Sequence, residues 1–128
     1  MLLDSNILSY AVRPENSSLR GQISAMPCHA STIARLETLG YHRLSAEDRS
    51  DLDAMFSELR MLPIDEPVIE RAIQLRQLRR MSLGDALTAA TALIHDLTLA
   101  TRNTDDFDWI AGLKLWDPFA SPASATNS

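Results

Sequence analysis

Short apolar runs alternate with longer amphipathic stretches along most of the chain. The short runs have the length of buried strands, and the longer stretches repeat their apolar residues at the spacing of a helix. The pattern predicts strands at residues 2–3, 28–30, 61–64, 98–100 and 114–116. It predicts helices at residues 7–12, 18–25, 33–43, 46–60, 66–80 and 83–96.

Several of the predicted helices begin at residues that cap helices. Ser45 with Asp48 and Ser82 with Asp85 have the spacing of a capping box. Strands separated by helices of this length pair in parallel, and a parallel sheet is normally covered on both faces. The sequence therefore predicts an α/β fold, a three-layer α/β/α sandwich around a central, mostly parallel sheet.

The length of 128 residues fits one domain. We expect this domain to cover residues 1–118. A disordered tail is expected at residues 119–128, because residues 121–128 offer no large apolar side chain to bury.

Composition narrows the class of protein. Cys28 is the only cysteine, so the sequence excludes a disulfide framework and a thiolate metal site, and the apolar neighbours of Cys28 favour a buried side chain. No apolar run approaches the ~18 residues of a membrane span, so we expect a cytoplasmic protein with no membrane partner. The net charge of −5 argues against a nucleic-acid partner, but a bound divalent cation would reverse the local field of clustered acids.

Acidic and amide side chains follow two of the predicted strands. Asp4 comes directly after the first strand, and Asn103 and Asp106 lie in a polar turn after the strand at residues 98–100. Open α/β sheets bind ligands at the carboxyl ends of their strands. Asp85, at the start of the helix at 83–96, is a candidate partner for Asp4, although its place after Ser82 is equally explained by helix capping.

Glu37 belongs to the helix predicted at residues 33–43. If Ile33, Leu36 and Gly40 face the sheet, Glu37 lies beside a buried stripe, where an acid needs a partner. A solvated Glu37 paired with a basic neighbour such as Arg35 is the alternative.

Carboxylates that converge at strand ends have a common chemical use. They bind one or two hard divalent cations, and Mg²⁺ and Mn²⁺ prefer such oxygen ligands while leaving positions open for phosphate. A cation bound there would activate water and neutralise charge on a phosphodiester. The pattern thus indicates phosphodiester hydrolysis.

Four motifs together give a resemblance to a known family. They are Leu3-Asp4-Ser5-Asn6, the segment 31–37, Gly84-Asp85-Ala86 with the alanines that follow, and Thr101-Arg102-Asn103 with Asp106-Phe107. The chain resembles the PIN-domain ribonucleases, and within them the VapC toxins of bacterial toxin-antitoxin pairs. The resemblance implies a Rossmann-like PIN fold, an endoribonuclease that depends on Mg²⁺ or Mn²⁺, and inhibition by a small VapB-type antitoxin.

The resemblance also implies roles for individual residues. Asp4 and Asp85 would be the main metal ligands, and Glu37 and Asp106 would complete the acidic pocket. Hydrogen bonds to ligands, water or RNA would come from three supporting residues, which are Asn6, Thr101 and Asn103. Many relatives carry Asp where this chain has Asn103, so the number of bound metals, one or two, stays open.

Other surfaces have two interpretations each. The apolar stripe of the helix at 46–60 is explained by core packing, or by a groove for an antitoxin helix or a homodimer contact. Arg76, Arg79 and Arg80 suit phosphate, but a solvated face paired with acids such as Glu70 is favoured. The alternatives for the whole chain are a housekeeping PIN nuclease in RNA processing and a nonenzymatic PIN-like module that binds RNA or protein.

Overall fold

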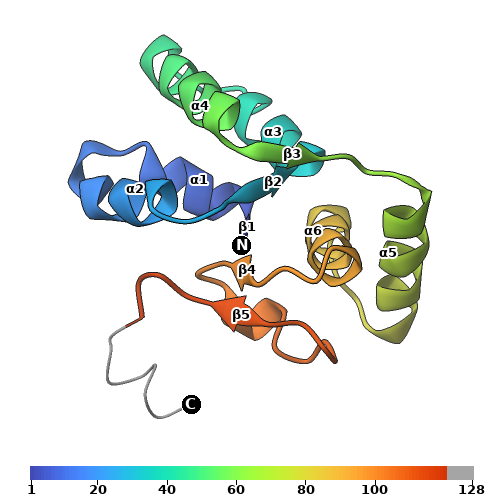
Figure 1. Ribbon diagram of the computed structural model, residues 1–128. Coiled ribbons are helices and arrows are strands. Elements are labelled where there is room, and N and C mark those ends of the chain that lie inside the picture. The colour runs from blue at the N-terminus through green and yellow to red at the C-terminus, as the bar shows by residue number, and fades with distance from the viewer. Residues whose placement is uncertain (121–128) are drawn as a thin grey trace.

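In the described part of the chain, five short parallel strands form the centre of the protein. The computed structural model describes residues 1–120. The strands are β1 (Leu2–Leu3), β2 (His29–Ser31), β3 (Arg60–Leu62), β4 (Leu99–Ala100) and β5 (Leu115–Trp116). They lie in the order β3-β2-β1-β4-β5, with every pairing parallel (Figure 1). Because β1 lies between β2 and β4, the residues that follow β1 lie at the middle of the edge formed by the carboxyl ends of the strands.

Within residues 1–120, six α-helices connect and cover the strands. They are α1 (Ser5–Ala11), α2 (Ser17–Ser24), α3 (Thr32–Leu39), α4 (Ala46–Glu58), α5 (Glu66–Leu78) and α6 (Leu83–Ile94). The predicted caps are present: the Ser45 hydroxyl accepts the Asp48 N–H at 3.0 Å, and the Ser82 hydroxyl accepts the Asp85 N–H at 3.1 Å. Short 3₁₀ turns occur at Pro14–Asn16 (η1) and Thr104–Asp106 (η2).

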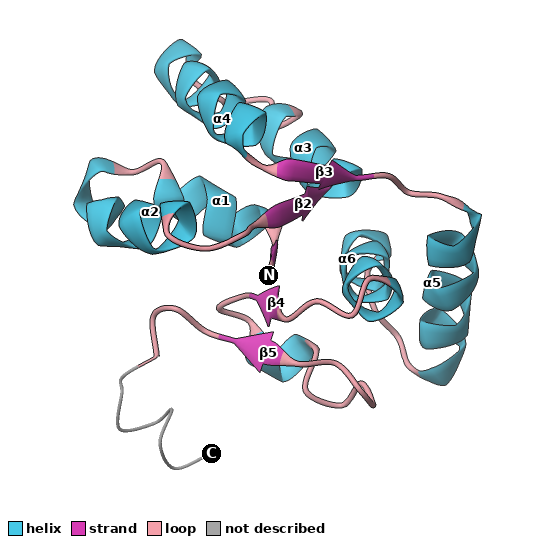
Figure 2. Cartoon of the chain, viewed as in Figure 1, coloured by secondary structure: helices cyan, strands magenta, loops and turns pink. Residues whose placement is uncertain are grey.

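The two faces of the sheet carry separate cores. Neighbouring strand residues point to opposite faces, so Leu3 and Ala100 pack with α1 to α4, whereas Leu2 and Leu99 pack with α5 and α6. Figure 2 shows α1 and α2 on one side of the strands and α5 and α6 on the other. The predicted three-layer α/β/α sandwich is therefore confirmed.

The prediction that Leu36 and Gly40 of the helix carrying Glu37 face the sheet is wrong. Helix α3 buries Ala34 and Thr38 instead of Leu36, which is 67% exposed. The helix also ends at Leu39, before Gly40 and well before the predicted residue 43. Small residues let α3 approach its neighbours closely, and this close packing overrides the larger apolar side chain in deciding which face is buried.

Three further predictions concern the chain as a whole. Cys28 is buried and its Sγ donates to the Ile23 carbonyl oxygen at 3.5 Å, as expected of a small core residue. Among residues 1–120, no helix is both long and apolar enough to cross a membrane. Residues 121–128 of the predicted disordered tail lie outside the described residues, so the tail stays a prediction.

Candidate metal centre at the carboxyl edge of the sheet

Asp4 lies where β1 ends and α1 begins. Its side chain is only 7% exposed, and its Oδ1 accepts the N–H of Ile7 at 2.8 Å, which caps α1. Burial raises the pKa of Asp4, while hydrogen bonds from the Thr101 hydroxyl and from Ile7 partly offset the rise and the charge of Asp85 adds to it. The carboxylate is therefore held in place by two neighbouring elements and is also close to a second acid.

Thr101 connects the ends of two adjacent strands. It follows β4 directly and is completely buried. Its hydroxyl donates to Asp4 and accepts the backbone N–H of Asn103 at 3.0 Å. Thr101 therefore fixes both the orientation of Asp4 and the path of the turn that carries Asn103.

Asp85 lies in the first turn of α6. Its backbone N–H is held by Ser82, and its side chain is half-buried. Partial burial raises the pKa of Asp85, the charge of Asp106 raises it further, and a hydrogen bond with the Ser82 side chain lowers it. Asp85 thus takes part in the cap and also lies among the other acids, so the two interpretations of this residue are compatible.

Glu37 reaches the same place from α3. The residue is largely exposed, but its carboxylate end lies against the backbone of Gly84 and accepts a hydrogen bond from the Ser5 hydroxyl. Desolvation of this end raises the pKa of Glu37, and the charges of Asp85 and Asp4 add to the rise. Glu37 forms no ion pair with Arg35 in the described structure, so the alternative of a solvated pair is not observed.

Asp106 belongs to the 3₁₀ turn η2 that follows β4. It is exposed, and its charge acts on Asp85 across the gap between η2 and α6. Asn103 precedes this turn and Asn6 lies in the first turn of α1, and both side chains are exposed. The predicted site residues thus lie at the carboxyl ends of β1 and β4 and on the helices beside them, with Asp4 and Thr101 buried, Asp85 half-buried and the others exposed.

The electrostatics of the four acids suit a divalent cation. Asp4, Glu37 and Asp85 have pKa values raised by burial or desolvation and by neighbouring carboxylates, so each charge costs free energy that an adjacent cation would recover. Within residues 1–120, no three acidic, histidine or cysteine side chains lie close enough together to hold one ion. Mg²⁺ is commonly bound by one or two carboxylates and keeps several waters, so the oxygen donors present fit such an ion.

Two residues at this site were not predicted from the sequence. Ser5 hydrogen-bonds Glu37, and Gly84 leaves the space that the Glu37 carboxylate occupies. A Cβ built on Gly84 would lie 3.1 Å from Cδ of Glu37 and closer still to one of its oxygens. The sequence signal for both was their position directly beside Asp4 and Asp85.

The cluster of arginines before Ser82 does not pair as predicted. Arg76 donates from Nε to the Met81 carbonyl oxygen at 3.2 Å, and the Arg79 guanidinium lies 5.3 Å from the centroid of the Trp109 ring. Neither forms an ion pair with Glu70 in the described part of the chain. Arg76 therefore stabilises the turn between α5 and α6, and Arg79 packs against the Trp109 ring.

Comparisons with known proteins agree with the fold and with the motifs. Residues 1–113 match the family model described as PIN domain. Ribonuclease VapC10 of Mycobacterium tuberculosis is 32% identical over 130 residues, 95% of each chain. Toxin FitB of Neisseria gonorrhoeae is 28% identical over 93% of this chain and 98% of its own. A toxin-antitoxin complex from Klebsiella pneumoniae matches with a TM-score of 0.73 and 28% identity, over 94% of this chain and 98% of that chain.

A parallel α/β sheet with acids gathered at its carboxyl edge defines a class of Rossmann-like proteins with an acidic site. The match over residues 1–113 narrows this class, and the chain belongs to the PIN-domain family. The resemblance inferred from the sequence motifs is confirmed.

Proposed function

We propose that the protein is a metal-dependent endoribonuclease and acts as the VapC-type toxin of a toxin-antitoxin pair. The convergence of Asp4, Glu37, Asp85 and Asp106 from separate elements carries the proposal, since Asp85 interacts through its charge with each of the other three acids. Ribonuclease VapC10 and Toxin FitB, which are similar over almost the whole chain, support it.

In this proposal Asp4 and Asp85 are the main ligands of Mg²⁺ or Mn²⁺, and Glu37 and Asp106 complete the acidic pocket. One or two such ions bound by these residues would supply an acidified water and positive charge beside the phosphodiester. The chain's own residues orient these ligands: Thr101 holds the Asp4 carboxylate, and the hydroxyl of Ser5 holds that of Glu37. Asn6 and Asn103, exposed beside the acids, hydrogen-bond the RNA or its water.

The proposed partners are RNA as substrate and a small VapB-type antitoxin, with a homodimer as the basic unit and a larger assembly with antitoxin. The complex from Klebsiella pneumoniae supports an antitoxin partner. A groove of about 320 Å³ between α2 and α4, lined by apolar residues such as Met55 and Leu59 and by charged residues such as Arg20, is the surface that we propose for the antitoxin. We also propose that the protein is located in the cytoplasm.

Cleavage of RNA by the purified protein tests the chemistry. We expect a structured RNA to be cut in the presence of Mg²⁺ or Mn²⁺ and to stay intact in excess chelator. Asp85→Asn should abolish cleavage with the fold unchanged, whereas Asp108→Asn, a matched change at an exposed acid two residues from Asp106, should retain it. Full activity of Asp85→Asn would refute the proposed mechanism.

Two further measurements separate this function from its alternatives. Growth arrest on expression of the protein, relieved by co-expression of a small protein from a neighbouring gene, would distinguish a toxin from a housekeeping nuclease. Sequencing of RNA ends after brief induction, compared between wild type and Asp85→Asn, would identify the target. A rise in melting temperature with Mn²⁺ would exclude a nonenzymatic module that has lost its metal site.

A further inference from the structure

A groove leaves the acidic site along one side of α1. It encloses about 390 Å³ between α1, the end of α3 and the beginning of α4. Ser5, Asn6 and Glu37 line both this groove and the acidic site. The groove and the acidic site are therefore continuous, and a substrate held at the carboxylates has this groove beside it.

The length of the groove follows from the helix that lines it. Ser5 and Ser9 lie one turn apart on the same face of α1, and Arg13 follows shortly after this helix ends at Ala11. At a rise of ~1.5 Å per residue, α1 from Ser5 to Ala11 extends about 9 Å, and Arg13 lies beyond its end. The cavity thus extends well beyond the reach of the metal ligands themselves.

The lining of the groove combines the groups that bind a nucleobase. Ser9 and Asn6 offer hydrogen bonds, and Tyr41, which is 54% exposed, offers an aromatic ring. Leu44 and Leu52 supply an apolar wall from the chain leading into α4 and from α4 itself. Ligand pockets typically combine an apolar surface with a few placed polar groups.

The ends of the groove are also suited to a nucleotide. The Tyr41 ring meets His42 edge-on at 5.2 Å between centroids, which helps to hold it in one orientation. At the far end Arg13, whose guanidinium lies 5.0 Å from the Tyr10 ring centroid, is a fixed cation for a phosphate. Asp48, at the start of α4, also lines the groove and offers a carboxylate, an acceptor that suits the amino group of a base.

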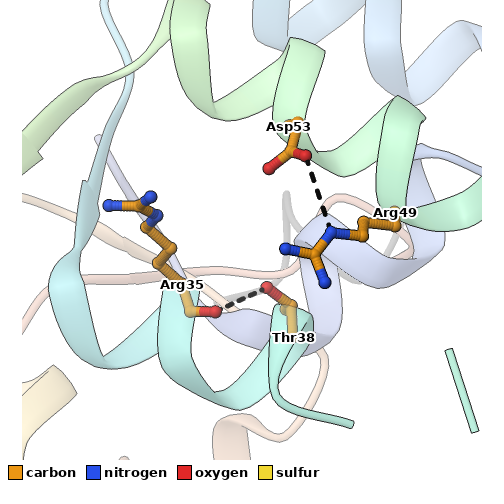
Figure 3. A network of polar contacts seen from close by, with 4 residues as sticks. All are labelled: Arg35, Thr38, Arg49 and Asp53. Carbon is orange, nitrogen blue, oxygen red and sulfur yellow. Dashed lines mark hydrogen bonds and ion pairs between the residues drawn. The ribbon is translucent and has the colours of Figure 1, made fainter.

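The Thr38 side chain, which α3 contributes to the groove, is held by hydrogen bonds. The Thr38 hydroxyl donates to the backbone oxygens of Ala34 at 2.8 Å and Arg35 at 3.4 Å, so it is bound within its own helix. Figure 3 shows this contact with Arg35 and, facing it on α4, the ion pair of Arg49 with Asp53. Thr38 therefore contributes shape to the groove, and recognition falls to Asn6, Ser9 and Tyr41.

The other cavities differ in position and chemistry. The α2–α4 groove is lined by Cys28 and Met26, which precede β2 and so lie at the amino edge of the sheet, away from the acids. A cavity of about 540 Å³ between α5 and α6 is mainly apolar and contains none of the four acids. Of these cavities, only the groove along α1 shares residues with the acidic site.

We propose that the groove along α1 is a nucleotide subsite, which holds the base of the ribonucleotide next to the phosphodiester that is cut. The inference rests on the proposed function, because it assigns the substrate of that site to the RNA class. The base stacks on Tyr41, hydrogen-bonds to Ser9 and Asn6, and places its phosphate toward Arg13. The groove therefore determines the nucleotide preference next to the cut.

Two variants test the subsite. Ser9→Leu fills the groove, and Tyr41→Ala removes its aromatic wall. Their matched controls are Ser50→Leu, an exposed position of α4, and Leu36→Ala, an exposed position of α3, neither of which lines the groove. Melting temperatures are compared first to verify that each variant is folded.

Steady-state cleavage of short single-stranded RNAs that differ at one nucleotide gives the first readout. Ser9→Leu and Tyr41→Ala should raise KM by about tenfold, the scale expected for losing one stacked base. They should also weaken the nucleotide preference next to the cut, with Mn²⁺ affinity unchanged. The two controls should match wild type. Unchanged KM and preference in both groove variants would overturn the proposal.

Direct binding gives a second readout that needs no catalysis. Each of the four ribonucleoside 5′-monophosphates is titrated into the metal-free Asp85→Asn protein, and backbone amide shifts are followed by NMR. Shifts at Ser9 and Tyr41 that disappear with Ser9→Leu support the subsite, even if wild type cuts no RNA and the proposed function fails. If wild type cuts RNA but no monophosphate shifts these amides and KM is unaffected, the subsite is wrong and the function stands.

Discussion

Gly84 provides the sharpest test of the site, because its lack of a side chain is what lets Glu37 approach α6. In Gly84→Ala the new methyl group would lie 3.1 Å from Cδ of Glu37 and would overlap one carboxylate oxygen. Glu37 is flexible at this end, so the carboxylate moves rather than the backbone. The change therefore displaces one acid of the site and leaves the fold in place.

The size of the effect follows from the geometry. Carbon atoms in contact are separated by ~3.5–4.0 Å, so the carboxyl group must retreat by about 0.5–1 Å. A misplacement of ~1 Å at a reacting site lowers rates by about 100-fold. Alanine is at the same time a better helix former than glycine by up to ~1 kcal/mol. We expect kcat/KM for RNA cleavage to fall by about 100-fold and the melting temperature to stay level or rise.

The assay combines cleavage rates, Mn²⁺ affinity by calorimetry, and thermal unfolding. Gly21→Ala is the matched control, since Gly21 lies within α2 and its Cβ would meet nothing within 4 Å. It should gain stability and keep full activity. In a Glu37→Ala background, Gly84→Ala should cause no further loss, because its effect acts through Glu37.

Two results would refute this reasoning. One is a Gly84→Ala protein with wild-type cleavage and Mn²⁺ affinity. The other is an equal loss of activity with and without Glu37, which would mean that the methyl group acts on the substrate or on α6 itself.

Substitutions at three other positions probe the site and its scaffold. Burial and the charge of Asp106 raise the pKa of Asp85, so metal-free Asp85→Asn should have a higher melting temperature than the wild type at neutral pH. That gain should shrink as the pH falls through the raised pKa of Asp85 and should vanish well below pH 3.8, where the carboxyl is protonated in both folded and unfolded states; a constant gain would contradict the electrostatic cause. Thr101→Val removes a hydrogen bond that lowers the pKa of Asp4, so the acid limb of the pH–rate profile should move to higher pH, and an unshifted limb would count against this contact. The variant should also lose ~1–3 kcal/mol in urea unfolding, because the N–H of Asn103 loses its acceptor. Gly112→Ala should cost about 1 kcal/mol by the same measurement, since the φ of Gly112 is +82°, and Gly112→Asn should cost less; equal stability of all three proteins would exclude backbone strain.

The helix starts and the order of elements could be predicted from the sequence because they depend on near neighbours. A cap such as Ser82 with the N–H of Asp85 joins residues three positions apart, so its residue types alone predict it. The same is true of Asp4, whose place at the carboxyl end of β1 follows from one short apolar run before a polar one. The candidate acids were therefore identified without knowledge of the strand order.

The contacts between those acids required the tertiary structure. Asp4 meets Thr101 because β1 pairs with β4, a neighbour 97 positions away at the first paired residues, Leu2 and Leu99. The buried face of α3 depends on how closely its neighbours approach, which small residues such as Ala34 and Thr38 permit and which apolar periodicity does not reveal.

The acidic residue types at strand and helix ends, and the chemistry that they favour, were properties of the sequence by itself. Only the tertiary structure decided that Glu37 lies against Gly84 and Ser5, and that a groove opens along α1 beside it. The physical reason is that capping and strand patterns arise from interactions within a few residues, whereas the placement of a long side chain arises from the packing of helices distant in sequence.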